Sequence, residues 1–416
     1  MTQSPAVPGS TGRGVHLAER AARTLTNELA RHHGPKTALL VGGRPDSPVL
    51  AAAIDGLLPG DGLTVVPAGP TSGSELREHI TAQGKWVSER VRVLESLAEA
   101  DPVDIVVLAE PLTGSADEAR SRLEGLAKYL TDGGVLTVAV PATPGATTGA
   151  AAELDRQGAL FGVAADLVLR NRPPVRIYRL RFTAADAALA ARLAPAHRPS
   201  SVPLTRRMHI DSSGVAAATL ALGLAAVTRV TRRKSRLWLL PAVAAAPLAA
   251  FFRDPERDVP EDESAVVAAS DGRVLSVERL RDERFGDGEF LRIAVFLSVL
   301  DVHVNRSPVA GKVVDYFVAD GGFAAAMTPL AEHNVAAYTV LDTPRGVVVV
   351  AQRTGLIARR IVQRAPLGAL VAKGERIGLI RFGSRTDVYL PADAADPLVG
   401  PGDKVIGGSS VIARWR

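Results

Sequence analysis

Cysteine is absent from this sequence of 416 residues. Without a thiol the chain forms no disulfide, offers no thiolate nucleophile and has no sulfur ligand for a metal ion or an iron–sulfur cluster. Aromatic residues are also scarce, at 4%, and they are not interleaved with basic residues as in proteins that bind single-stranded nucleic acid. We therefore expect no nucleic-acid partner, although the formal net charge is +5.

The first 15 residues lack the apolar stretch that a secretory signal peptide needs. They are rich in Ser, Pro, Gly and Thr, and we expect them to form a disordered leader. The remaining chain is longer than the size at which one hydrophobic core stops growing. The sequence therefore predicts a multidomain protein.

Short apolar runs alternate with helical stretches between residues 16 and 185. The apolar runs are Thr37–Gly42, Leu63–Pro67, Asp104–Ala109 and Val135–Pro141, and a helix is expected over Ala116–Leu130. This alternation is typical of βαβ units. It predicts an N-terminal Rossmann-like α/β domain with a parallel sheet, closed by a β-hairpin within residues 166–182.

This pattern resembles the sheet of S-adenosylmethionine-dependent methyltransferases. The turn after the first strand, Gly42-Gly43-Arg44-Pro45-Asp46, lacks the glycine spacing of a nucleotide-binding turn, and residues 65–68 lack an acidic residue to hold a ribose. We expect a retained fold that does not bind S-adenosylmethionine and acts as a regulatory or docking module. A working methyltransferase fused to a second enzyme is the alternative.

Residues 186–213 are expected to form a linker, followed by two nearly uncharged segments within residues 214–252. These segments, Gly214–Val227 and Leu237–Phe252, flank Arg229–Arg236, which has five positive charges in eight residues. Each segment is shorter than the ~20 residues that span a bilayer. We expect a membrane-associated helical hairpin with its ends and basic loop on one face of an anionic membrane. A buried helical pair is the alternative.

Residues 253–416 are dominated by strand signals and predict a mostly-β domain. The clearest runs are Val266–Ala269, Leu291–Leu297, Val313–Phe317, Val335–Leu341 and Gly346–Gln352. Residues 403–413 are expected to form a closing β-hairpin.

Few residues in this β-rich part are suited to chemistry. His303 follows a strand-like run, Asp271 follows another, and Gly383-Ser384 lies in a bend between strands. Serine, histidine and aspartate are the components of a charge-relay set, in which the histidine takes the serine proton and the aspartate orients the imidazole. None of the three motifs is specific alone.

Four motifs occur in order: Phe-Phe-Arg-Asp-Pro-Glu-Arg at 251–257, Ala-Ser-Asp-Gly at 269–272, residues 296–308 around His303, and Arg-Phe-Gly-Ser-Arg at 381–385. This series, from about Leu237 to the C-terminus, resembles the short bacterial and archaeal phosphatidylserine decarboxylase proenzymes. The resemblance implies cleavage between Gly383 and Ser384, assisted by Asp271 and His303. It also implies a β chain (1–383) paired with an α chain (384–416), alone or in a larger assembly.

The resemblance further implies that Ser384 becomes a covalent pyruvoyl cofactor and that no metal is needed. The pyruvoyl ketone would bind the amine of phosphatidylserine as a Schiff base and act as an electron sink when carbon dioxide leaves, giving phosphatidylethanolamine. His303 is the candidate acid that reprotonates the carbanion. The expected activity is that of a carboxy-lyase at the cytoplasmic face of the cell membrane, with phosphatidylserine and anionic membrane lipid as partners.

The chain departs from the family pattern at two places. Where longer members have a second histidine, this chain has Arg306, so either His303 serves both cleavage and protonation, or Arg306 holds the substrate phosphate or carboxylate. Where the family often has Asn-Glu-Arg, this chain has Asn334 followed by Val335-Ala336, so it keeps the asparagine but lacks the charged pair, and Asn334 is a second substrate-binding candidate. A non-catalytic membrane-bound scaffold is therefore the alternative function. Gly408-Ser409 is a competing cleavage site, but it would leave a very short α chain.

Overall fold

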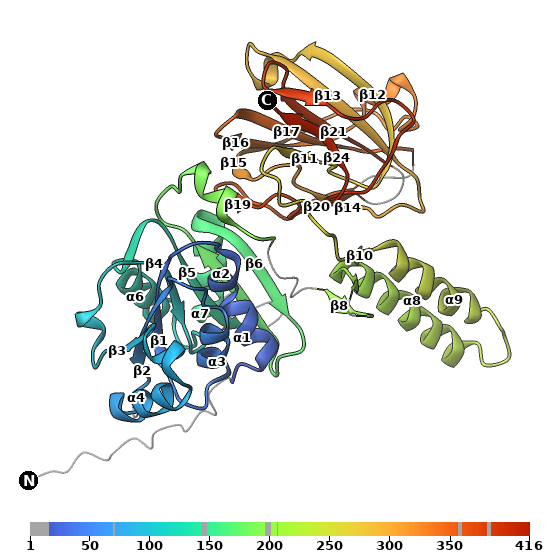
Figure 1. Ribbon diagram of the computed structural model, residues 1–416. Helices are drawn as coiled ribbons and strands as arrows, with labels where there is room; N and C mark the ends of the chain where they lie inside the picture. The colour runs from blue at the N-terminus through green and yellow to red at the C-terminus, as the bar shows by residue number, and fades with distance from the viewer. Residues whose placement is uncertain are drawn as a thin grey trace, which may run out of the picture.

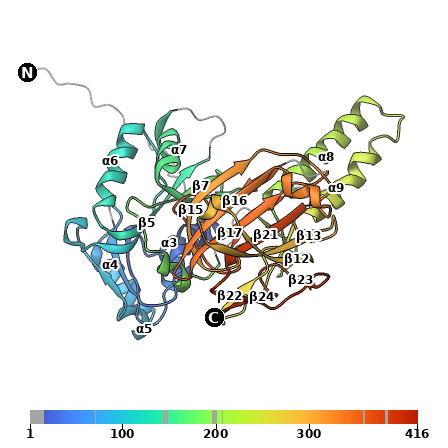
Figure 2. The same cartoon turned by 90° about the horizontal axis from the view of Figure 1, so that it is seen from above.

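The computed structural model describes residues 16–69, 71–142, 148–195, 201–205, 207–356, 360–380 and 384–416. The expected leader, residues 1–15, lies outside the described residues. Figure 1 shows an N-terminal α/β part, a C-terminal β part above it, and a helical hairpin that projects to one side. The view from above in Figure 2 shows the same projecting hairpin.

The N-terminal part is a seven-stranded sheet in the order β3-β2-β1-β4-β5-β7-β6. Its strands are β1 (Thr37–Gly43), β2 (Gly62–Pro67), β3 (Val91–Val93), β4 (Val103–Leu108), β5 (Leu130–Pro141), β6 (Gly162–Val168) and β7 (Val175–Leu180). The first five are parallel, and β7 runs antiparallel to both β5 and β6. The predicted parallel sheet and its closing hairpin are both confirmed.

Helices cover both faces of this sheet. They are α1 (Glu19–Leu25), α2 (Asn27–Arg31), α3 (Pro48–Asp55), α4 (Gly73–Ala82), α5 (Lys85–Ser88), α6 (Ala116–Ala127) and α7 (Gly149–Phe161). Ala38 and Leu40 of β1 face the core under α1 and α3, whereas Leu39 and Val41 face the core under α6 and α7. Successive strand residues point to opposite faces, so a fully apolar strand supplies both cores.

The segment expected as a linker contains ordered structure. It holds the 3₁₀ helix η2 (Ala187–Arg192) and the strands β8 (Val202–Pro203) and β9 (Met208–Ile210). β9 pairs with β10 (Arg253–Pro255), so a small antiparallel ribbon joins the two ends of the hairpin.

The hairpin consists of α8 (Ser212–Thr231) and α9 (Leu239–Phe251), which pack against each other. At its base a Cβ on Gly214 would lie 2.7 Å from Cβ of Phe252 and 3.1 Å from the carbonyl oxygen of Ala249. Only glycine permits this close approach. α8 is 20 residues long, longer than the apolar segment within it, and its most apolar window is only 11% buried.

The C-terminal part is built around an eight-stranded antiparallel sheet in the order β19-β15-β16-β17-β21-β13-β12-β23. Its strands are β12 (Gly272–Arg281), β13 (Glu289–Leu297), β15 (Gly311–Ala319), β16 (Ala336–Thr343), β17 (Gly346–Arg353), β19 (Leu370–Val371), β21 (Ser384–Pro391) and β23 (Lys404–Val405). Two three-stranded sheets complete this part. One holds β11 (Ala265–Val267), β24 (Val411–Trp415) and β22 (Ala395–Pro397), and the other holds β14 (Val304–Arg306), β20 (Arg376–Ile380) and β18 (Ile361–Gln363).

The mostly-β prediction is therefore confirmed, but the closing hairpin is wrong. β23 pairs with β12, whereas β24 pairs with β11 and β22 in another sheet. Gly408, at φ 79°, redirects the chain between them, and its amide donates to the carbonyl of Ala268 at 2.8 Å.

The two folded parts contact each other through charged side chains. Arg31 of α2 forms an ion pair with Glu375, which directly precedes β20. Arg181 donates to the carbonyl of Gly368, and Lys312 donates to the carbonyl of Ala185, each at 3.0 Å. A small apolar cluster that includes residues of η2 and β19 fills the same interface.

Candidate active site

Ser384 is the first residue of β21, and its side chain is fully buried. It pairs with Leu297, the last residue of β13. Among the described residues, Ser384 Oγ has no hydrogen-bond partner. A buried hydroxyl without a partner costs free energy, so it marks a site of chemistry better than a site of packing. Gly383, the other half of the expected cleavage bond, lies outside the described residues.

His303 ends the loop after β13 and is only 1% exposed. Its Nδ1 lies 2.9 Å from the carbonyl oxygen of Asp301. A carbonyl only accepts, so Nδ1 carries the proton and the neutral ring has its lone pair on Nε2. Burial lowers the pKa of His303 to about 4, assisted by Arg253 and opposed by Asp301 and Asp271. The imidazole is therefore uncharged at neutral pH and can accept a proton.

The hairpin reaches this imidazole directly. Phe251, the last residue of α9, lies with its ring centroid 4.2 Å from that of His303. Phe251 and Phe252 form an apolar cluster with Leu379 of β20. This cluster contributes to the burial that lowers the pKa of the imidazole, and it connects the base of the hairpin to the site.

Two segments bring His303 and Ser384 into one region. The amide of Ile380, the last residue of β20, donates to the carbonyl of His303 at 3.2 Å. Ser384 follows Ile380 by four residues, so their Cα atoms are at most about 14 Å apart. From the other direction, the strand partner of Ser384 is Leu297, which precedes His303 by six residues.

Asp271 lies at the edge of the same region. Its two carboxylate oxygens each accept from Arg257 Nη2 at 2.7 Å, and Oδ1 also accepts from the amide of Gly407 at 2.9 Å. Its electrostatic effect raises the pKa of His303. The next residue, Gly272, has φ +148°, and a Cβ there would lie 2.1 Å from the carbonyl oxygen of Phe296. Glycine is therefore required at the turn that places Asp271.

The two substrate-binding candidates have structural partners. The buried guanidinium of Arg306 donates to Asp254 Oδ1 at 2.9 Å and to the carbonyls of Pro255 and Gly374 at 3.0 Å. The amide of Asn334 bonds in both directions to the backbone of Ala324 and also donates to the carbonyl of Thr354 at 2.8 Å. Among the described residues, Ser384 Oγ forms no hydrogen bond with either side chain.

Sequence reasoning missed several residues of this region. Phe251 and Arg257 belong to the motif at 251–257, which was used only to identify the resemblance. Their contacts with His303 and Asp271 were not predicted. Thr386 and Ser270 share a hydroxyl–hydroxyl bond of 2.8 Å, which ties β21 to the segment that carries Asp271. No local sequence signal links two residues that are so far apart in the chain. Within the residues that the structure describes, no group of three or more His, Asp or Glu side chains could hold a metal ion.

Comparison with known proteins places the β-rich part in a family. A family model described as Phosphatidylserine decarboxylase matches residues 245–413. A phosphatidylserine decarboxylase proenzyme of Symbiobacterium thermophilum is 48% identical over 183 residues, which cover 42% of this chain and 84% of that protein. The chain belongs to the phosphatidylserine decarboxylase family.

Other members of the phosphatidylserine decarboxylase family match the same part of the chain. The proenzyme of Thermobifida fusca is 45% identical over 195 residues, 47% of this chain and 86% of that protein. That of Erythrobacter litoralis is 42% identical over 214 residues, 48% of this chain and 83% of that protein. Ser384, His303 and Asp271 all lie inside the region matched by the family model.

Solved structures also match part of the chain. Mitomycin 7-O-methyltransferase MmcR has a TM-score of 0.29 and 21% identity, covering 39% of this chain and 53% of that chain. TrmN from Thermus thermophilus has a TM-score of 0.30 and 16% identity, covering 39% and 48%.

Proposed function

We propose that this chain is a phosphatidylserine decarboxylase, a carboxy-lyase that makes a pyruvoyl group from its own Ser384. The observation that carries the proposal is the buried Ser384 Oγ, which has no hydrogen-bond partner among the described residues and lies at the start of a central strand. Relatives that are 42–48% identical are named proenzymes, a name that suits a chain activated by cutting.

Self-cleavage begins when Nε2 of His303 accepts the proton of Ser384 Oγ. Oγ attacks the carbonyl carbon of Gly383, and the acyl group moves from nitrogen to oxygen, so that an ester replaces the amide. Loss of the Cα proton of residue 384 then breaks the Cβ–O bond, which releases the Gly383 carboxylate and leaves dehydroalanine. One water molecule hydrolyses the dehydroalanine to a pyruvoyl group and ammonia. Asp271 favours the first step because it raises the proton affinity of His303.

The pyruvoyl group supplies a carbonyl that binds the amine of phosphatidylserine and takes up the electrons left when carbon dioxide departs. We assign to His303 the return of a proton to the substrate carbon. Because burial lowers the pKa of this imidazole to about 4, the ring is neutral at pH 7 and must first take up a proton at Nε2 from solvent, after which the imidazolium gives it up readily. The ring of Phe251, 4.2 Å away, keeps water from one side of the imidazole.

We also propose that the hairpin holds the enzyme on the cytoplasmic face of the cell membrane. Leu220, Leu224 and Val227 form a stripe along α8 and are 75%, 59% and 60% exposed. Leu300, which is 83% exposed, lies in the loop before His303, and its carbonyl accepts a hydrogen bond from Arg253 at the hairpin base. Anionic lipid would attract the basic loop of residues 229–236. Such a surface would deliver a lipid headgroup beside His303.

Intact mass of the purified protein tests the cleavage. We expect two fragments, residues 1–383 and residues 384–416 with an N-terminal pyruvoyl group. Ser384→Ala should leave the chain whole, whereas Ser409→Ala, at the competing Gly-Ser, should still be cut. A wild-type chain of full mass that releases no carbon dioxide from phosphatidylserine vesicles would refute the enzymatic proposal and favour a non-catalytic scaffold.

For the N-terminal domain we propose a docking role without S-adenosylmethionine. Arg44 and Glu110, which follow β1 and β4 at the carboxyl edge of the sheet, are joined by an ion pair of 2.6 Å. In open α/β sheets a ligand usually binds at this edge. Calorimetric titration of the full chain with S-adenosylmethionine should give no heat of binding, whereas saturable heat would support a bifunctional enzyme.

A further inference from the structure

Cleavage before Ser384 would remove the covalent link that holds this residue in place. Residue 384 would become a chain end, and chain ends open at little free-energy cost. The reacting carbonyl must nevertheless stay in place, because a displacement of about 1 Å can slow an enzyme about 100-fold. Non-covalent contacts must therefore hold residue 384 in place once it is the N-terminus of the α chain. This requirement rests on the function proposed above.

Backbone pairing alone holds residue 384 weakly. Ser384 pairs with Leu297 of β13, but pairing with β17 on the other side begins only at Arg385, opposite Arg353. The terminal residue therefore has one neighbouring strand, whereas the residues after it have two.

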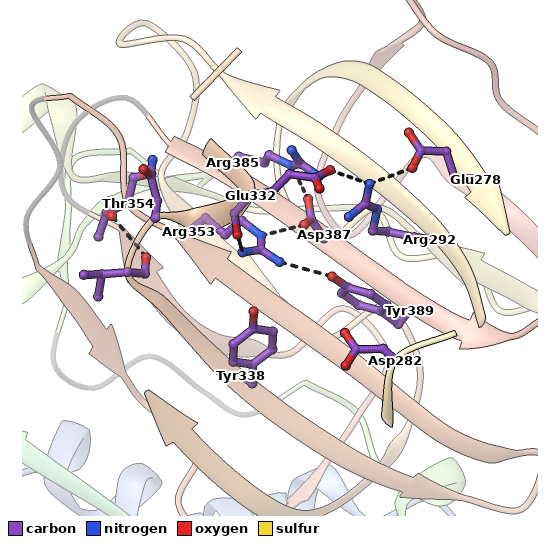
Figure 3. Close-up of polar contacts among 12 residues, drawn as sticks. Glu278, Asp282, Arg292, Glu332, Tyr338, Arg353, Thr354, Arg385, Asp387 and Tyr389 are labelled. Atoms are coloured by element: carbon purple, nitrogen blue, oxygen red, sulfur yellow. Dashed lines mark hydrogen bonds and ion pairs between the residues drawn. The ribbon is translucent and has the colours of Figure 1, made fainter. Parts of the chain in front are cut away.

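A buried ionic cluster lies directly behind this end of the strand (Figure 3). Asp387 Oδ2 accepts from Arg353 Nε at 2.7 Å, and Asp387 Oδ1 accepts from Arg385 Nε at 2.6 Å. The three side chains are 0%, 3% and 5% exposed for Asp387, Arg353 and Arg385. We call these three residues the arginine–aspartate clamp. One buried carboxylate thus bridges two nearly buried guanidinium groups.

The clamp crosses the boundary between the two fragments. Asp387 and Arg385 belong to the proposed α chain, whereas Arg353 belongs to the β chain. Arg353 also donates to the hydroxyl of Tyr389 in the α chain at 3.2 Å and to the carbonyl of Glu332 in the β chain at 2.8 Å. Arg353 therefore bonds to two α-chain side chains, Asp387 and Tyr389, while its bond to Glu332 anchors it within the β chain.

The clamp and the site lie on opposite faces of the same strand. Side chains alternate along β21, so Arg385 and Asp387 face the clamp while Ser384 and Thr386 face the other way. On that other face Thr386 bonds to Ser270, the neighbour of Asp271, at 2.8 Å. The strand is thus pinned on both faces within three residues of its proposed new end, and the clamp does so without contacting the site.

We propose that the arginine–aspartate clamp is a positioning device that keeps residue 384 in the active site after the chain is cut. A buried ion pair is a poor source of stability compared with apolar packing of the same volume, but removal of one partner is strongly destabilising. A buried ion pair is therefore suited to holding a residue in one specific position rather than to adding stability. Before cleavage the peptide bond to Gly383 holds Ser384, so the clamp matters chiefly afterwards.

Asp387→Asn tests the clamp, because it keeps the shape of the side chain and removes its charge. We expect complete self-cleavage by intact mass, a fall of about tenfold or more in kcat per cleaved chain, and release of the α chain at lower urea in size-exclusion chromatography. In an uncut Ser384→Ala background the same substitution should shift the urea midpoint by less. Glu28→Gln is the matched control, since Glu28 is likewise buried and forms ion pairs with Arg31 and Arg179 inside the β chain, and it should leave α-chain retention and kcat unchanged.

Wild-type turnover and α-chain retention in Asp387→Asn would overturn the proposal, and so would a folded variant that fails to cleave. Equal shifts of the urea midpoint in cut and uncut backgrounds would show a general structural role and would also overturn it. If Asp387→Asn does not fold, Arg353→Lys decides by the same readouts, because lysine keeps the charge but loses the planar fork. An uncut wild-type chain would instead refute the proposed function itself.

Discussion

Acidification should destabilise the protein through His303 in particular. In the folded state burial lowers the pKa of this imidazole to about 4, whereas in the unfolded chain it takes its ordinary value of about 6.5. Between these values the unfolded state binds a proton that the folded state does not bind. The free energy of unfolding therefore falls as the pH falls, starting below about pH 6.5 and ending below about pH 4.

The size of this loss follows from the two pKa values. Their difference of about 2.5 units, at about 1.4 kcal/mol per unit, corresponds to about 3 kcal/mol. Solvent screening reduces it little, because His303 is only 1% exposed. A loss of this size is a large fraction of the stability of a typical domain.

Urea unfolding at pH 7 and pH 4 measures the effect. The two proteins to compare are Ser384→Ala and Ser384→Ala with His303→Gln, because both keep an uncut chain. The carboxylates titrate in both proteins, whereas His303 titrates only in Ser384→Ala. The free energy of unfolding of Ser384→Ala should therefore fall by about 3 kcal/mol more on acidification than that of the double variant. Equal losses would refute the assignment of His303 as a buried neutral imidazole.

Three further outcomes follow from the structure. Gly272→Ala should lower the free energy of unfolding by about 2 kcal/mol or more in urea titrations, because φ is +148° and the new Cβ meets a carbonyl oxygen. Leu220→Asp combined with Leu240→Asp should weaken binding to anionic vesicles about tenfold or more in a flotation assay, with little change in melting temperature, because the two leucines are 75% and 70% exposed. Arg31→Ala should cost about 3–5 kcal/mol in urea unfolding, because it leaves the buried carboxylate of Glu375 without its cation.

The fold was largely predictable where the sequence is periodic. Apolar runs such as 37–42 and 104–109 are buried on both faces, as parallel strands must be, and they became β1 and β4. The closing hairpin at 403–413 failed because pairing partners of strands are set by distant segments. β23 pairs with β12 and β24 pairs with β11. The sequence of residues 403–413 does not indicate which distant strand each of them pairs with.

The candidate site residues could be named from the sequence, but only some of the contacts that they make could be predicted. Ser384, His303 and Asp271 could be named from motifs, yet the carbonyl of Asp301 that fixes the imidazole tautomer depends on how one loop folds. Arg306 was a candidate to hold the substrate phosphate or carboxylate, and its bond to Asp254 inside the protein could not be read from the sequence. Charge in a sequence does not reveal whether its partner is a substrate or another side chain.

The contact between the N-terminal domain and the β domain uses main-chain oxygens as acceptors at most of its polar points. Among the described residues, Arg181 and Lys312 bond to the carbonyls of Gly368 and Ala185, whereas Arg31 and Glu375 meet side chain to side chain. Substitution of Gly368 or Ala185 changes the side chain but keeps the backbone carbonyl that accepts the hydrogen bond. Across diverging sequences, paired substitution at this junction should therefore concentrate on Arg31 and Glu375, while the residues that offer carbonyls drift independently.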